Sequence, residues 1–119
     1  MIQSWEVWKD RTKKFALRII NVYRSLPNDK VSQTIGGQLL RSGTSVAANY
    51  RAACRGRSQA ERFSKLCIVV EEADETAFWL EMLVEVNILT IEKLKDLMEE
   101  NEEIVKYMNT VKYNANPKK

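Results

Sequence analysis

Apolar residues recur at helical spacing along nearly the whole chain, and no stretch of useful length alternates as a β-strand does. Four such segments can be separated, at about residues 5–26, 31–54, 58–87 and 91–113. Their similar lengths and short connections predict a single all-α domain over residues 1–119. The predicted architecture is an antiparallel up-down-up-down four-helix bundle.

Local signals predict where these helices begin and end. Pro27 disfavours helix at the residue before it and therefore ends the first segment. Gly56 follows the second segment and suits a left-handed C-terminal cap. Ser58 with Glu61 forms a capping box at the start of the third segment, and Thr90 suits the N-cap of the fourth.

The second segment contains residues that are unusual inside a helix. Gly36, Gly37 and Gly43 each cost roughly 1 kcal/mol relative to Ala there. They favour close approach of a neighbouring helix, and a break at the Gly36–Gly37 pair is the alternative. Asn49 occupies a core-facing position, where one buried polar residue can fix helix register. Glu81 is its expected partner in a buried polar pair, with a water-filled end of the bundle as the alternative.

The third segment is apolar on almost every side. Its expected core-facing positions are Phe63, Leu66, Val70, Ala73, Ala77, Leu80 and Val84. A second apolar stripe lies roughly opposite and consists of Trp79, Met82, Leu83 and Val86; Phe78 lies between the two and is counted with the second stripe in the expected interface. A helix that is apolar nearly all round must be covered nearly all round, and an uncovered stripe of this size usually marks an interface. We therefore expect self-association through this stripe; coverage by the first helix is the alternative.

Charge is unevenly distributed, although the net charge is only +3. Residues 30–60 contain basic side chains and no acidic one, whereas residues 61–89 are predominantly acidic. Phosphate-binding candidates in the basic stretch are Arg41, Arg51, Arg55 and Arg57. Two alternatives remain: the stripe pairs with the acidic helix of a neighbouring subunit, or it is a solvated surface. If the two stretches are neighbours within the fold, part of their charge cancels there.

Residues that usually carry catalysis or bind metals are scarce. The chain has no histidine, which removes His-activated nucleophiles and imidazole metal ligands. Its two cysteines match no metal or redox spacing and are expected to be buried thiols. We expect no catalytic residues, metal site or cofactor, and hence a non-enzymatic protein. No long apolar run or signal peptide is present, so we expect a cytoplasmic protein without membrane contact.

Two blocks of sequence carry a family resemblance. LRSGTSVAANYR at residues 40–51 and EADETAFWLEML at residues 72–83 closely resemble the bacterial family named for 23S rRNA intervening sequences, also called the S23 ribosomal protein family. The resemblance spans essentially the whole chain. It implies a four-helix bundle that assembles into homopentamers and has no enzymatic activity. A related accessory protein of diversity-generating retroelements binds nucleic acid and a reverse transcriptase. The expected partners are therefore further copies of the chain, RNA or DNA, or another protein.

Overall fold

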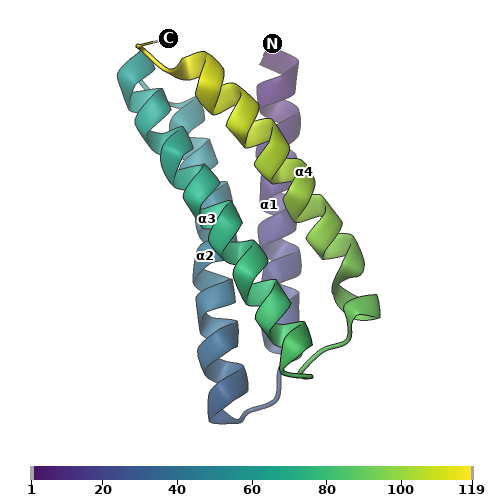
Figure 1. Ribbon diagram of the computed structural model, residues 1–119. Helices are drawn as coiled ribbons and strands as arrows, with labels where there is room; N and C mark the ends of the chain where they lie inside the picture. The colour runs from purple at the N-terminus through teal and green to yellow at the C-terminus, as the bar shows by residue number, and fades with distance from the viewer. Residues whose placement is uncertain (1, 119) are drawn as a thin grey trace.

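The computed structural model describes residues 2–118, with side chains from residue 4 onward, and consists of four long helices. They are α1 (Ile2–Arg24), α2 (Lys30–Cys54), α3 (Gln59–Glu85) and α4 (Ile91–Ala115). The helices run antiparallel, so both chain ends lie at one end of the bundle and the α1–α2 and α3–α4 connections lie at the other (Figure 1). The predicted all-α four-helix bundle is confirmed. Within the described residues, none of the helices is both long and apolar enough to cross a membrane.

The helices pack mainly against their neighbours in sequence, and α1 and α4 meet through large side chains. Trp8 of α1 stacks on Tyr107 of α4, with ring centroids 4.1 Å apart and planes 7° from parallel. The Arg11 guanidinium lies 3.9 Å from the centre of the Trp8 ring and forms an ion pair with Glu100 at 2.6 Å. These side chains close the α1–α4 side, where the two backbones have few close contacts.

The glycines of α2 allow α1 to approach closely, as the sequence predicted. A Cβ atom added at Gly43 would lie 2.8 Å from Cγ1 of Ile19, and one at Gly36 would overlap Leu26. Gly37 faces open space, with nothing within 4 Å of an added Cβ. The alternative of a break at Gly36–Gly37 is wrong, because α2 continues through both residues.

The core-facing side of α3 is rotated from the predicted one. Its buried residues are Leu66, Val69, Ala73, Thr76, Leu80 and Leu83. Thr76 fits in the core because its hydroxyl group donates to the Glu72 carbonyl at 2.8 Å and lies 2.9 Å from the Ser42 hydroxyl. Leu83 is fully buried inside the chain, so its assignment to an oligomer interface is wrong. The apolar pattern of α3 is too nearly uniform to fix its rotation.

The buried polar pair predicted between Asn49 and Glu81 is also wrong. Asn49 is half-buried and donates to both the backbone and hydroxyl oxygens of Ser45, at 3.0 and 2.8 Å, while Glu81 is exposed. The buried amide of the core is instead Asn101, which donates to the Ala73 carbonyl at 3.1 Å. Its Oδ1 atom is buried without a hydrogen-bond partner.

The helix-end predictions are confirmed in part. Ser58 caps α3 by accepting from the Glu61 N–H at 3.1 Å. Thr90 occupies the N-cap of α4, although its side chain makes no capping bond. Gly56 does not adopt the predicted left-handed conformation. Glycine is favoured at this position for a different reason: a Cβ atom added at Gly56 would lie 2.6 Å from Cγ of Arg62.

Candidate functional site

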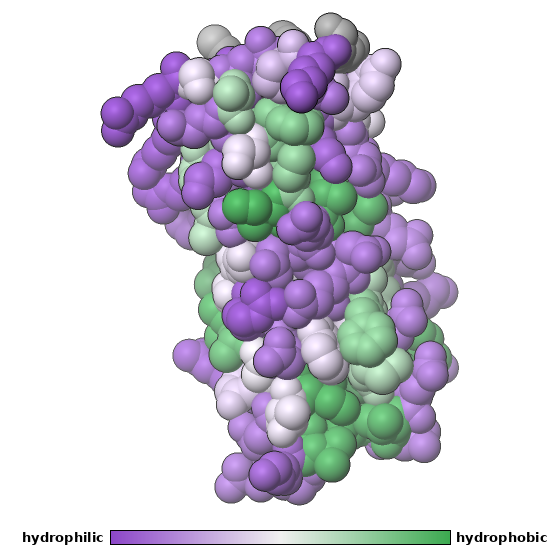
Figure 2. All heavy atoms as spheres, turned by 60° about the vertical axis from the view of Figure 1, so that its left-hand side comes forward, coloured by the Kyte–Doolittle hydropathy of each residue, from purple (hydrophilic) through white to green (hydrophobic). Residues whose placement is uncertain are grey.

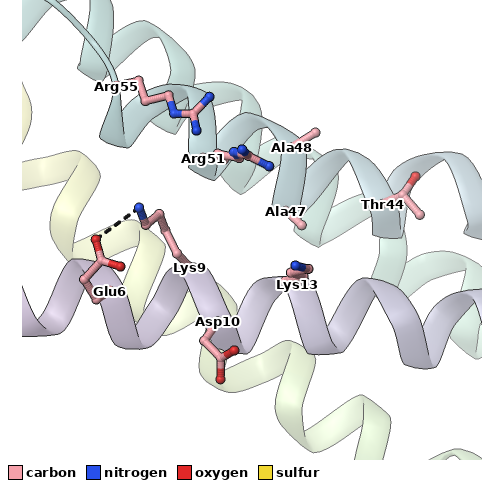
Figure 3. A pocket seen from close by; sticks show the side chains of 9 residues that line it. All are labelled: Glu6, Lys9, Asp10, Lys13, Thr44, Ala47, Ala48, Arg51 and Arg55. Atoms are coloured by element: carbon pink, nitrogen blue, oxygen red, sulfur yellow. Dashed lines mark ion pairs between the residues drawn. The ribbon is translucent and has the colours of Figure 1, made fainter.

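A groove between α1 and α2 is lined by four basic and two acidic side chains, and we call it the basic groove (Figure 3). Its volume is about 530 Å³. Lys9 and Lys13 line it from α1, and Arg51 and Arg55 line it from α2. The remaining lining residues are Glu6, Asp10, Thr44, Ala47 and Ala48.

Helical periodicity places the four cations on the two walls. Lys9 and Lys13 are four residues apart on α1, and so are Arg51 and Arg55 on α2, so each pair projects from one side of its helix. The fully buried Tyr50 and Ala53 fix the rotation of α2 and leave the two arginines outside the core. Arg51 and Arg55 lie along α2 beside the groove, and Lys9 reaches from α1 toward α2 (Figure 3).

Acidic partners neutralise only part of this charge. Lys9 forms an ion pair with Glu6 at 3.1 Å. Asp10 lines the groove but its carboxylate points away from α2 (Figure 3). It pairs at 2.9 Å with Lys14, which is not a lining residue. Within residues 4–118, Lys13, Arg51 and Arg55 form no ion pair or side-chain hydrogen bond. Three unpaired cations therefore face one groove.

Arg41, which the sequence grouped with these arginines, lies elsewhere. It binds two carboxylates of α3 in the same chain, contacting Glu72 at 3.1 Å and also pairing with Glu75. Hydrogen bonds from the Trp79 indole and from Arg41 lower the pKa of the Glu75 carboxyl. Arg41 is thus satisfied within the chain and does not line the basic groove, which corrects its assignment as a phosphate contact.

Arg57 is exposed in the connection between α2 and α3 and also lies outside the groove lining. Its backbone N–H donates to the Glu61 carboxylate at 3.2 Å. Of the four predicted arginines, the structure brings together only Arg51 and Arg55. The sequence analysis did not predict Lys9 and Lys13, which lie on a different helix from the arginines, although their four-residue spacing is a detectable signal.

The stripe predicted for self-association is partly exposed. Phe78 and Val86 are 48% and 46% exposed, and Trp79 and Met82 are half-buried. Val31, at the start of α2 and at the same end of the bundle as Val86, is 56% exposed. We call these five residues the apolar patch. Figure 2 shows apolar atoms gathered at this end of the molecule, beyond a polar belt.

Other reactive groups offer little chemistry. Burial raises the pKa of the Cys54 thiol, which disfavours the nucleophilic thiolate. Burial also raises the pKa of the Tyr50 hydroxyl, which lies 3.1 Å from that of Tyr107. No group of three or more Cys, Asp or Glu residues in the described part of the chain could hold a metal ion.

Comparisons with known proteins agree with the fold. Residues 3–110 match the family described as 23S rRNA-intervening sequence protein. A crystal structure at 1.70 Å resolution, of a protein with unknown function from the S23 ribosomal protein family of Bacteroides thetaiotaomicron, is similar with a TM-score of 0.86. The two chains share 37% sequence identity, over 92% of this chain and 97% of that one. No curated protein sequence matches this chain.

Proposed function

The chain belongs to the family of 23S rRNA-intervening sequence proteins, and from this premise we propose that it is a non-enzymatic accessory protein that binds the phosphate backbone of nucleic acid. The observation that carries the proposal is the basic groove, where Lys13, Arg51 and Arg55 have no acidic partner among the side chains that the structure describes. The absence of histidine and the raised pKa of the Cys54 thiol support a non-enzymatic role.

The physical reason is counterion release. Unpaired lysine and arginine side chains replace cations condensed on the phosphates, and the freed cations make binding favourable and dependent on salt. Arginine also pairs with two phosphate oxygens at once through its planar guanidinium group. Exposed cations that already have a carboxylate partner, such as Arg41, contribute little to this process.

A titration at several salt concentrations tests the proposal. A fluorescently labelled RNA oligonucleotide is titrated with the protein, and the logarithm of the binding constant is plotted against the logarithm of the salt concentration. Each single-strand contact contributes about 0.7 to the slope, so three contacts per subunit give a slope of roughly 2. Several subunits acting on one strand would multiply this value.

Substituting the unpaired basic residues of the groove tests whether the groove is the binding site. Lys13→Ala with Arg51→Ala and Arg55→Ala should abolish most of the slope. A matched control replaces Arg24, Lys30 and Lys95, which are exposed and lie toward the opposite end of the bundle. Both triple variants lower the net charge of +3 by three, so they differ only in where the charge is lost. Equal loss of binding in both would contradict the groove as the binding site, and so would full binding by the groove variant.

The apolar patch favours a second candidate function: a homo-oligomeric scaffold that binds proteins and makes no nucleic-acid contact. Phe78, Val86 and Val31 expose about half of their surface, and a contiguous exposed apolar patch usually marks an interface. We expect a homopentamer of the 13.8 kDa chain. Light scattering that gives the mass of one chain at micromolar concentration would contradict this second candidate.

A further inference from the structure

We propose that the outer side of α3 binds the outer side of α1 in a second copy of this chain, so that successive copies join head to tail. The two surfaces carry the same arrangement with opposite charge: an exposed apolar residue, with one charged residue four positions before it and another seven positions after it. The inference rests on the homo-oligomer described above as the second candidate function, and it names the two surfaces that join its copies. It is independent of nucleic-acid binding.

On α3, the exposed Phe78 is surrounded by carboxylates. Its side chain is 48% exposed. Exposed acidic residues project from the same side of the helix, spaced with Phe78 three and four residues apart: Glu71, Asp74, Glu81 and Glu85. Within residues 4–118, none of these carboxylates forms an ion pair or a side-chain hydrogen bond. We call this surface the acidic face of α3.

Two of these carboxylates lie where the helix itself disfavours them. Glu85 is the last residue of α3, Glu81 is about one turn earlier, and the last turn contains no basic residue. The C-terminal end of a helix carries partial negative charge, so a carboxylate there is unfavourable and a cation is favourable. A cation supplied by another copy would offset this cost.

On α1, the exposed Leu17 is flanked by cations. Its side chain is 52% exposed. Lys13 lies four residues before it and Arg24 seven residues after it, so all three project from one side of the helix. Both cations are exposed, and within residues 4–118 neither forms an ion pair or a side-chain hydrogen bond. Lys13 also lines the basic groove, whereas Leu17 and Arg24 do not. We call these three residues the basic face of α1.

The two faces also match in position along the bundle. Arg24 and Glu85 are the last residues of α1 and α3, and both helices finish at the same end of the bundle (Figure 1). Leu17 and Phe78 each lie seven residues earlier, which is about 10 Å along a helix axis. Because α1 and α3 run in the same direction, a copy rotated about an axis along the bundle would place Leu17 beside Phe78 and Arg24 beside Glu85.

The match continues farther from this end. Lys13 and Asp74 each lie eleven residues before the end of their helix and would form a second pair of opposite charges. Asp10 and Glu71, which are both acidic, would meet about one turn beyond them. Lys14 reduces that repulsion because it already pairs with Asp10 at 2.9 Å. The register therefore gains an apolar contact and two pairs of opposite charge.

The two faces cannot satisfy each other within one chain. α1 packs against α2 and α4, and α3 packs against the same two helices. Among the described residues, the backbones of α1 and α3 do not come into contact. Two α3 faces placed against each other would oppose four carboxylates with four more, so a symmetric α3–α3 contact is disfavoured. The interface is therefore heterologous and joins different surfaces of the two copies.

A charge swap tests the pairing of Arg24 with Glu85. Arg24→Glu alone and Glu85→Arg alone each place like charges together, and each should raise the dissociation constant of the assembly about threefold to tenfold. The double variant restores a pair of opposite charges and should return to the wild-type value. Light scattering over a dilution series measures the constant, and circular dichroism checks the fold. Lys95→Glu, a charge reversal at an exposed position of α4, is the control and should leave the constant unchanged. The charge-matched control of the salt titration also removes Arg24, so its mass is measured in the same series.

Leu17→Glu tests the apolar contact. A carboxylate beside Phe78 and its acidic neighbours should weaken the assembly at least about tenfold. Val7→Glu is the matched control, because Val7 is 51% exposed on the same helix but lies ten residues from Leu17, toward the other end of α1. Salt provides an independent measurement: raising it from about 50 to about 500 mM should weaken a contact between opposite charges, whereas it would strengthen a symmetric α3–α3 contact by screening the repulsion.

The possible failures can be told apart. A wild-type protein with the mass of one chain would overturn the homo-oligomer and this inference with it. An oligomer that neither Arg24→Glu nor Glu85→Arg weakens would overturn the α1–α3 interface and leave the homo-oligomer intact. If both single variants weaken the assembly and their combination weakens it further, the two residues do not face each other and the proposed register is wrong. Equal weakening by Val7→Glu and Leu17→Glu would overturn the contact between Leu17 and Phe78.

Discussion

Gly43 and Gly37 lie in the same helix but face different surroundings, so Ala at each position separates helix propensity from packing. An added Cβ at Gly43 would lie 2.8 and 2.9 Å from the two γ carbons of Ile19. At Gly37 nothing lies within 4 Å of the added atom. Both substitutions make the same chemical change, and Gly37→Ala therefore serves as the control for Gly43→Ala.

The two substitutions should move stability in opposite directions. Ala is favoured over Gly inside a helix by about 0.8–1.0 kcal/mol, so Gly37→Ala should stabilise the fold by roughly that amount. Forcing an extra carbon into a packed core costs about 1–3 kcal/mol. Ile19 is fully buried and branched at Cβ, so it cannot turn both γ carbons away from the new methyl group. The gain in helix propensity offsets part of this cost, so we expect Gly43→Ala to destabilise the fold by a net amount of up to about 2 kcal/mol.

Removing the γ carbons of Ile19 should change the effect of Gly43→Ala on stability from destabilising to stabilising. Ile19→Ala deletes both γ carbons and by itself should cost about 2–5 kcal/mol through the cavity it leaves. In that background the added methyl group meets only the Cβ atom of residue 19, at 3.2 Å, so Gly43→Ala regains most of its helix propensity. The cycle should show a coupling free energy of about 1–3 kcal/mol between residues 19 and 43.

Urea unfolding followed by circular dichroism measures these differences. All variants are compared at one protein concentration, because self-association would make apparent stability depend on concentration. A shifted midpoint with an unchanged m value reports stability alone. The packing argument is refuted if Gly43→Ala is as stable as Gly37→Ala, or if it destabilises the Ile19→Ala protein as much as the wild type.

Two further predictions concern the surface of α3. The pKa of Glu75 is lowered by the Trp79 indole and by Arg41, so its contribution to stability is present above the pKa of the unfolded chain and is lost as pH falls through the lower pKa of the fold. The Trp79 indole N–H resonance should therefore shift at a pH below the ordinary glutamate range, and a shift within that range would contradict the hydrogen bond. Met82→Lys with Val86→Lys should reduce the oligomer mass in light scattering while circular dichroism stays unchanged, because charge on the apolar patch opposes burial. Asn109→Lys with Thr110→Lys, on exposed positions of α4, adds the same charge and should leave the mass unchanged; loss of mass in this control would argue for general charge repulsion.

The sequence predicts the four helices well because each has both an apolar seam and a signal at its ends. It predicts the rotation of α3 poorly because hydrophobic residues surround that helix, and because Thr76 becomes a core residue only through its contact with Ser42. The sequence predicts only one side of the basic groove. Arg51 and Arg55 are visible as a basic pair on α2, but their partners Lys9 and Lys13 lie about 40 residues away, and only packing brings them together.

The position of α2 between α1 and α3 explains why equivalent arginines acquire different roles. Arg41 faces the acidic α3, and Glu72 and Glu75 neutralise it. Arg51 and Arg55 face α1 across the groove, where Lys9 and Lys13 add positive charge. Local sequence cannot distinguish these cases, because the difference depends on which neighbour each side of α2 meets.

The same arrangement links the groove to stability. Like charges facing each other across α1 and α2 repel, and the close packing of Ile19 against Gly43 holds the two helices together farther along their length. An anion placed between the rows would remove this repulsion, and any ligand that binds only the folded chain adds stability through mass action. A chain selected for stability alone would gain from acidic residues at positions 9 or 13. The four cations therefore fit a surface that binds a polyanion between α1 and α2.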